Sequence, residues 1–366
     1  MLRTPDSVLP VHVTRERNRY PDIHPWAHNR VVLKAHQVKK QKEENVVDVD
    51  VDVDVDVDAD VEIVERLDGT VEDEDGDANG GEEVKDGEEI GVGYINASPI
   101  ELGREERYIA TQGPLERSGG ISAFWEMCWQ EGVEVIVMLT RCVEDGREKC
   151  GVYYPEVVGG IRDVGDEWGE VVCVGFREEN RTEIRELSVR RLGGEDGKEE
   201  ERTVWHFLFI GWPDMEVPRE KEDQKNLLEL IRMSRFRIDE RAGTSEEAQK
   251  EVEEKNSKPT VVHCSAGVGR TGTFIALDHL LKELEEGKLD GLIGEGKDDV
   301  DPIFDTVKRL REQRMFMVYQ PGQYAFIYQI LRERWEERQK GRNTPMAKEA
   351  SLKDGKIPLK TYNKSR

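Results

Sequence analysis

The sequence lacks long apolar segments. No run approaches the roughly 18 apolar residues of a membrane-spanning helix anywhere in its 366 residues. The first residues, MLRTPDSVLPVHVTRERNR, contain no apolar core like that of a signal peptide. These absences favour a cytoplasmic protein, with the nucleus as a second location, and argue against a membrane as a partner.

Cysteine is scarce, and its spacing excludes two kinds of site. The five cysteines form no Cys-x-x-Cys pair and no spacing typical of metal ligands. Their odd number also argues against a disulfide framework. We therefore expect free thiols in a reducing compartment, one of them reactive, and neither a metal nor another cofactor. The cysteines are Cys128, Cys142, Cys150, Cys173 and Cys264.

Basic residues are outnumbered, but the imbalance is local. The net charge is −24, and residues 43–89 hold 22 Asp and Glu against only Arg66 and Lys85. The rest of the chain is nearly balanced, so the overall charge does not oppose an anionic substrate. It argues weakly against nucleic acid as a partner.

Low-complexity composition marks the places where the chain departs from a compact domain. In VDVDVDVDVDADV a strand would line up aspartates on one face, so residues 43–89 are predicted to be a disordered insert. Residues 238–258 read as a second charged insert, and residues 341–366 as a disordered tail. The remainder predicts one catalytic domain over residues 1–340, interrupted by the two inserts.

The stretch Val261 to Phe274, VVHCSAGVGRTGTF, organises the chain. A short β-branched run ends in His263 and Cys264, and a small-residue loop then leads into a helical pattern from Thr271. Glycines in such a loop let successive backbone N–H groups point inward, and the helix N-terminus adds its positive end. This arrangement predicts a phosphate-binding loop.

Three side chains give this loop a chemistry. The dipoles that bind phosphate also favour the thiolate of Cys264, which makes it a nucleophile near neutral pH. The planar fork of Arg270 matches two phosphoryl oxygens at once. The hydroxyl of Thr271 can stabilise the sulfur as a leaving group. The alternative, a buried structural cysteine beside an ordinary turn, does not account for the combination of Cys264, Arg270 and Thr271 around one loop.

His263, Cys264, Gly267, Arg270 and the following Thr-Gly fit one H-C-x5-R-[ST]-G template. The stretch resembles the signature of the non-receptor, Cys-dependent protein tyrosine phosphatases. Asn18 to Leu33, NRYPDIHPWAHNRVVL, resembles the phosphotyrosine-recognition loop of that family. The resemblance implies that Tyr20 flanks the substrate ring and that Asp22 accepts a hydrogen bond from the substrate backbone. An ordinary packing role for Tyr20 is the alternative.

Two further loops carry the resemblance. Glu144 to Pro155 resembles the loop in which a Glu pairs with the signature Arg and a Lys lies near the site, which implies these roles for Glu144 and Lys149. A solvated surface lysine is an equal alternative for Lys149. Trp212-Pro213-Asp214, about 50 residues before the Cys loop, resembles the mobile general-acid loop.

The resemblance covers Asn18 to about Arg338 and implies an α/β fold, a highly twisted mixed β-sheet flanked by α-helices. It also implies two-step hydrolysis of phosphotyrosine without a metal. The implied catalytic residues are Cys264, Arg270, Asp214, Thr271 and Gln323. The implied substrate-binding residues are Tyr20, Asp22, Lys149, Ser265, Ala266, Gly267, Val268 and Gly269. His263, Glu144 and Trp212 are implied to support them.

Two departures from the family pattern stand out. Only 17 residues precede Asn18, where the family usually has additional helical structure, so we expect a shortened form. At positions 319–324 the family usually reads Gln-Thr-x-x-Gln-Tyr, and Tyr319 occupies the place of the first Gln if Gln323 aligns with the second. We expect this exchange to slow hydrolysis of the phosphocysteine, unless the turn at Pro321 brings Gln320 back.

Periodicity and turn residues predict the other elements. Expected strands are 30–34, 93–100, 107–115, 133–139, 170–177, 183–190, 203–210 and 260–262, and expected helices are 118–130, 217–237, 271–281, 301–314 and 323–339.

Two other functions stay open from the sequence. A phosphotyrosine-binding pseudophosphatase would trap substrates without turnover, and a dual-specificity phosphatase would also accept phosphoserine. The expected partners are phosphotyrosine-containing proteins, bound by a monomeric catalytic domain.

Overall fold

The computed structural model describes residues 15–34, 93–103, 106–165, 168–192, 199–235, 258–290 and 300–342. The predicted inserts at 43–89 and 238–258 lie outside the described residues, apart from Lys258. The predicted tail at 341–366 also lies outside them, apart from the end of the last helix.

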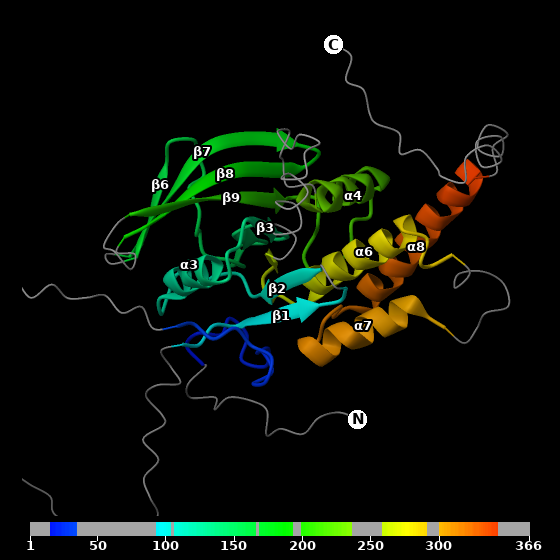
Figure 1. Cartoon of the computed structure of the whole chain (residues 1–366), viewed down its shortest axis with the longest axis horizontal. Coiled ribbons are helices and arrows are strands. Elements are labelled where there is room, and N and C mark those ends of the chain that lie inside the picture. The colour runs from blue at the N-terminus through cyan, green and yellow to red at the C-terminus, as the bar shows by residue number, and fades with distance from the viewer. Residues whose placement is uncertain are drawn as a thin grey trace, which may run out of the picture.

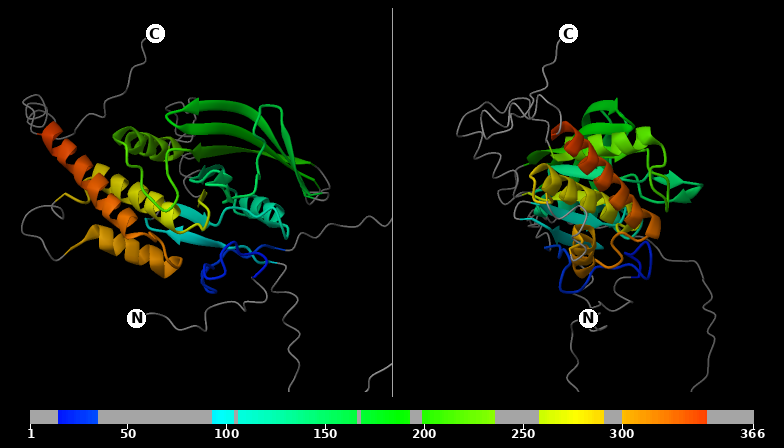
Figure 2. Two further views of the ribbon diagram at one scale, coloured as in Figure 1. Left: turned by 180° about the vertical axis from the view of Figure 1, so that it is seen from behind. Right: turned by 90° about the vertical axis from the view of Figure 1, so that its right-hand side faces the viewer.

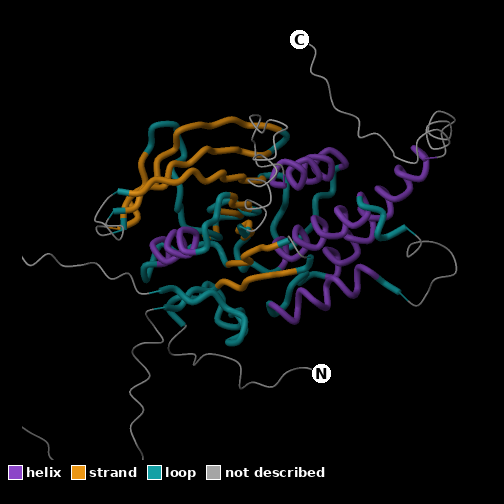
Figure 3. The backbone as a smooth tube through the Cα atoms, in the orientation of Figure 1, coloured by secondary structure: helices purple, strands orange, loops and turns teal. Residues whose placement is uncertain are grey.

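A mixed sheet of eight strands forms the centre of the described molecule, in the order β1-β2-β10-β3-β9-β8-β7-β6 (Figure 1). The neighbours β2, β10, β3 and β9 run parallel, and the remaining neighbours run antiparallel. The strands form one twisted surface (Figure 3), which confirms the predicted α/β fold. Strand bounds are β1 Ala97–Glu101, β2 Arg107–Thr111, β3 Val135–Met138, β6 Ile161–Gly165, β7 Gly169–Glu179, β8 Thr182–Arg191, β9 Glu200–Phe209 and β10 Thr260–His263.

Central strands read as continuous apolar runs because both of their faces are buried. In β3, Val135 and Val137 face one hydrophobic core, whereas Ile136 and Met138 face another on the opposite side of the sheet. This alternation is the period of two expected of a strand. It confirms the buried strand predicted over 133–139.

Helices cover both faces of the sheet. Helix α3 (Gly120–Gln130) packs with one core. The other core includes residues of α4 (Lys221–Arg235), α6 (Gly269–Glu285), α7 (Pro302–Gln313) and α8 (Pro321–Arg342). Helices α7 and α8 lie at the end of the molecule away from the long antiparallel strands (Figures 1 and 2).

Two local predictions are wrong, and one strand was not predicted. Residues 30–34 do not form a strand, and only Val32 makes an isolated bridge, to Tyr94. Strand β6 was not predicted, because its sequence IRDVG is short and mostly polar or exposed. Helix α4 begins at Lys221 rather than near Pro218. A small hairpin, β4 (Val143–Glu144) with β5 (Arg147–Glu148), forms the start of the loop expected over 144–155.

The topology places the signature stretch at the middle of the sheet. Strand β10 lies between β2 and β3, both parallel to it, and ends at His263. The chain then turns directly into α6. Loops at the carboxyl ends of parallel strands are the usual location of ligand sites in α/β folds.

Candidate active site

The loop between β10 and α6 has the backbone that the sequence predicts. Gly267 has a φ of 70°, and a Cβ atom there would lie 2.1 Å from the carbonyl oxygen of Thr111. Only glycine combines that conformation with that close approach. The N–H of Gly267 donates to the sulfur of Cys264 at 3.3 Å, so a backbone donor of the loop already points at the thiol.

Cys264 lies almost fully buried at the start of this loop, with 4% of its surface exposed. Burial by itself raises the pKa of a thiol, but the charge of Arg270, the Thr271 hydroxyl and N–H, and the Gly267 N–H outweigh it and lower the pKa of Cys264. The Thr271 hydroxyl has no other hydrogen-bond partner among the described residues. These contacts therefore stabilise the Cys264 thiolate relative to that of an ordinary cysteine.

Arg270 is buried and ties three segments together. Its Nη1 and Nη2 donate to the two carboxylate oxygens of Glu144 at 2.8 and 3.0 Å, a bidentate pair. Nη2 also donates to Oδ1 of Asp214 at 2.9 Å, and Nη1 to the carbonyl oxygen of Trp212 at 3.2 Å. The contact between Glu144 and the signature Arg matches the implied pairing.

Asp214 lies between two cations. Besides Arg270, its Oδ2 accepts a hydrogen bond from Nζ of Lys149 at 2.5 Å. Trp212 is buried, and its Nε1 donates to the carbonyl oxygen of Glu216 at 2.9 Å, which closes the loop around the acid. The contact favours a site role for Lys149 over that of a solvated surface lysine.

Among the described residues, one hydrogen bond joins the N-terminal loop to the phosphate loop. The hydroxyl of Tyr20 lies 2.9 Å from Oγ of Ser265. Asp22 is exposed on the same loop, and no described residue is hydrogen-bonded to its carboxylate. Of the remaining loop residues, Val268 is buried and Ala266 half-buried.

A buried chain of hydrogen bonds supports the phosphate loop on the side of the sheet. Nε2 of His263 lies 2.7 Å from the hydroxyl of Tyr153, which in turn lies 2.9 Å from Nε2 of His206. Burial lowers the pKa of His263 to about 4, so its ring is neutral at pH 7. Its Nδ1 then lies 3.2 Å from the carbonyl oxygen of Cys264, which fixes the orientation of that peptide.

Gln323 and Tyr319 occupy different environments. Gln323 is buried, and a Cβ on Gly269 would lie 3.0 Å from its Oε1, so its amide touches the phosphate loop. The N–H of Gln320 donates to that Oε1 at 3.2 Å. The side chain of Tyr319 is half exposed.

Arg314 is not among the predicted site residues, yet it holds the phosphate loop from inside the protein. This arginine is fully buried; its Nε donates to the carbonyl oxygen of Gly267 at 2.8 Å and its Nη2 to that of Ala266 at 3.2 Å. Nη1 and Nη2 also donate to Oγ of Ser98 and Oδ1 of Asn96. Its acceptors among the described residues are all neutral, and burial lowers its pKa to about 10.

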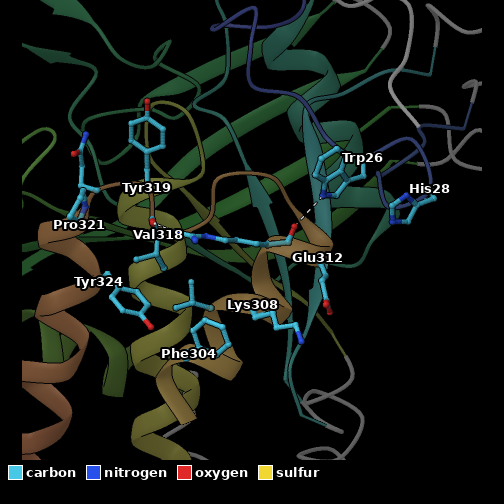
Figure 4. Close-up of a pocket in the computed structure, with 12 residues that line it drawn as sticks. Trp26, His28, Phe304, Lys308, Glu312, Val318, Tyr319, Pro321 and Tyr324 are labelled. Atoms are coloured by element: carbon cyan, nitrogen blue, oxygen red, sulfur yellow. Dashed lines mark hydrogen bonds between the residues drawn. The ribbon is translucent and has the colours of Figure 1, made fainter. Parts of the chain in front are cut away.

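A large pocket of about 940 Å³ lies between the N-terminal loop, helix α7 and the turn before α8 (Figure 4). The turn at Tyr319 and Pro321 forms one wall, helix α7 contributes Phe304, and Trp26 of the N-terminal loop forms another side. Nε1 of Trp26 donates to the carbonyl oxygen of Arg311 at 3.3 Å. The pocket thus borders two of the segments that contact the phosphate loop, the N-terminal loop and the turn before α8.

Comparison with known proteins decides the family. The family model of protein-tyrosine phosphatase matches residues 79–333. The chain belongs to the protein-tyrosine phosphatase family. It is 36% identical over 242 residues to rat and human tyrosine-protein phosphatase non-receptor type 9, covering 66% of this chain and 37% of theirs. It is 37% identical over 247 residues to human receptor-type tyrosine-protein phosphatase C, covering 67% of this chain and 16% of that protein.

The chain thus spans 37% or less of the length of these curated relatives. Within the described ranges, none of the helices of this phosphatase family member combines the length and apolar character needed to cross a membrane. The same ranges hold no group of three metal-ligating side chains.

Proposed function

We propose that this chain hydrolyses phosphotyrosine in proteins through a phosphocysteine intermediate. Cys264 is the nucleophile, Arg270 binds the phosphate and Asp214 is the general acid and base. The observation that carries the proposal is the Arg270 side chain, whose charge lowers the pKa of Cys264 while its Nη2 is bonded to Asp214. One cation therefore joins nucleophile and acid.

In the first step the thiolate of Cys264 attacks phosphorus and the bond to the phenolic oxygen breaks. Arg270 and the N–H groups of the loop bind the equatorial oxygens, and Asp214 gives its proton to the leaving phenolate. The phosphate competes with Asp214 for Nη2 of Arg270, which frees the carboxyl group to turn toward the leaving group. Glu144 holds the guanidinium in place during this exchange, since its two bonds are independent of Asp214.

In the second step water attacks phosphorus and the sulfur–phosphorus bond breaks. Asp214, now a carboxylate, takes a proton from the water, and the Thr271 hydroxyl stabilises the departing thiolate. The Gln323 amide, in contact with Gly269, is in place to orient the water. Tyr319 cannot supply a second amide.

The substrate is phosphotyrosine because the phosphate loop lies beneath Tyr20. The Tyr20 to Ser265 contact supports a wall that a long phenyl linker passes and a short serine linker does not. Asp22, exposed at the rim, accepts a hydrogen bond from the substrate backbone. We assign the monomeric domain to the cytoplasm, in keeping with its five free cysteines.

Replacing Asp214 with Asn tests the proposal with a matched control. General acid catalysis contributes about 10² to 10⁴-fold, so Asp214→Asn is expected to lower kcat on a phosphotyrosine peptide by that factor. Glu216→Gln removes the same charge from the same loop and should leave kcat nearly unchanged. An aryl phosphate with a very good leaving group should show a much smaller loss in Asp214→Asn.

Cys264→Ser completes the test, because it removes the nucleophile and leaves Arg270 and the loop N–H groups. Turnover is expected to vanish while phosphopeptide binding persists. Residual turnover above trace would contradict the covalent route, and a wild-type protein that binds phosphopeptide without turnover would be a pseudophosphatase.

A further inference from the structure

Two free thiols outside the signature lie side by side at the base of the β4–β5 hairpin. The N–H groups of Lys149 and Cys150 both donate to the carbonyl oxygen of Cys142, at 2.8 and 3.3 Å. Two residues thus oppose one, which is a β-bulge, and it places Cys150 beside Cys142. Both sulfur atoms donate to the carbonyl oxygen of Gly151, at 3.9 Å from Cys142 and 3.1 Å from Cys150.

The two thiols are unequal. Cys142 is half-buried and within reach of solvent, whereas Cys150 is buried. A hydrogen bond from Cys150 lowers the pKa of Cys142, against the effect of its own burial, and the Tyr154 hydroxyl also lowers it. Burial raises the pKa of Cys150, so this thiol keeps its proton. Glu156 and Glu116 face Cys142 and oppose its ionisation.

We propose that Cys142 and Cys150 form a second oxidation site, a dithiol that hydrogen peroxide converts to a disulfide independently of Cys264. The sulfur of Cys142 attacks one peroxide oxygen and becomes a sulfenic acid, and the other oxygen leaves as water. The sulfur of Cys150 then attacks that of Cys142, and its proton leaves with the hydroxyl group as a second water. Peroxide is reduced to two waters and two thiols become one disulfide.

The position of the dithiol links oxidation to the candidate active site. The loop that the disulfide closes carries Glu144 and Lys149, which bond to Arg270 and Asp214 respectively. A new bond at the base of the hairpin changes the bulge at Lys149, and with it the geometry of both contacts. This consequence, unlike the disulfide itself, rests on the proposed function.

The sequence makes the disulfide easy to detect. Trypsin cleaves after Arg141, Arg147 and Lys149, so Cys142 falls in peptide 142–147 and Cys150 in peptide 150–162. The other three cysteines fall in three further peptides, 118–141, 163–177 and 256–270. Full-length wild-type protein is treated with graded peroxide, alkylated after unfolding, digested without reductant and analysed by mass spectrometry.

We expect peptides 142–147 and 150–162 to appear joined at peroxide levels that leave 118–141 and 163–177 fully alkylated. Reductant should separate them, and Cys142→Ser and Cys150→Ala should each abolish the joined species. The Cys264→Ser protein should still form it. Cys142 recovered only as unlinked higher oxides, or either thiol joined instead to Cys264, would overturn the proposal. The wild-type result decides this even if a variant fails to fold.

Activity tests the consequence in wild-type protein whose Cys264 is protected by inorganic phosphate during oxidation. Phosphate is then removed, and full alkylation of peptide 256–270 verifies that Cys264 is intact. The kcat/KM of this protein is expected to be lower by a factor of about ten and to recover with reductant. A displaced charge-assisted hydrogen bond has an effect of that order. Joined peptides with unchanged kcat/KM would refute the link to the active site and leave the proposed phosphatase function standing.

Discussion

Replacing Arg314 with Met tests how much the phosphate loop depends on a cation that never touches solvent. The change leaves four buried acceptors without their donor, the carbonyl oxygens of Gly267 and Ala266 and the side chains of Ser98 and Asn96. At about 1 to 1.5 kcal/mol for each acceptor, the loss is about 4 to 6 kcal/mol.

A second effect opposes this loss. The pKa of Arg314 is lowered by burial to about 10, which corresponds to about 3 kcal/mol spent on keeping the charge inside the protein. Methionine does not carry that cost. The difference predicts a net destabilisation of about 1 to 3 kcal/mol, a fall in Tm of about 2 to 12 °C for a domain of this size.

The assay combines stability and function. Thermal unfolding of Arg314→Met gives the change in Tm. Inhibition by inorganic phosphate reports the integrity of the loop, and this inhibition should weaken. Arg314→Lys keeps the charge with fewer donors in a different geometry and should also weaken phosphate binding. Lys308→Met changes an exposed lysine on α7, the helix that ends next to Arg314, and is the control. Wild-type Tm and phosphate affinity in Arg314→Met would refute the reasoning.

Three further outcomes follow from the site. Glu144→Gln removes the charge of the bidentate partner of Arg270 and should lower kcat/KM by about 10 to 100-fold. The control is Asp145→Asn, which removes an exposed charge from the same hairpin and should change kcat/KM little. Tyr20→Ala should narrow the preference for phosphotyrosine over phosphoserine peptides, and an unchanged ratio of kcat/KM values would count against Tyr20 as the wall. Because His263 is neutral in the folded state down to pH about 4 while an unfolded histidine takes a proton below about 6.5, stability should fall as pH drops through this window. Urea unfolding at pH 7 and pH 5 should show His263→Asn losing about 2 kcal/mol of that dependence.

The parts of the site that are local in sequence could be predicted. The strand, glycine turn and helix at 261–274 follow from residues that are neighbours in the chain, and Gly267 adopts the positive φ that the loop requires. Central strands were also predictable, because burial on both faces leaves an apolar run such as Val135–Met138. Strand β6 was not, because its outward residues carry no such pattern.

Contacts between distant segments left weaker signals. Tyr153 is hydrogen-bonded to His263, 110 positions further along the chain, and a single tyrosine in a loop does not predict such a partner. Arg314 had a signal that could have been used. It is the C-cap residue of α7, at a position that continues the spacing of the buried residues Ile303, Val307 and Leu310, where a charged residue is unexpected. A buried arginine at the end of an apolar stripe predicts buried acceptors, although not which ones.

The chain leaves the described residues after Lys34 and re-enters them at Gly93. The positions of these two points explain how a domain of this family accommodates a long additional segment. The N–H of Leu33 donates to the carbonyl oxygen of Gly93 at 3.0 Å, so the stretch 34–92 begins and ends at one point. The adjoining anchor is stronger than a single contact. Val32 bridges to Tyr94, and the Tyr94 hydroxyl donates to Asn18 at 2.7 Å, two residues before Tyr20. The position of Tyr20 over the phosphate loop therefore depends on these anchors rather than on the length of the chain between them.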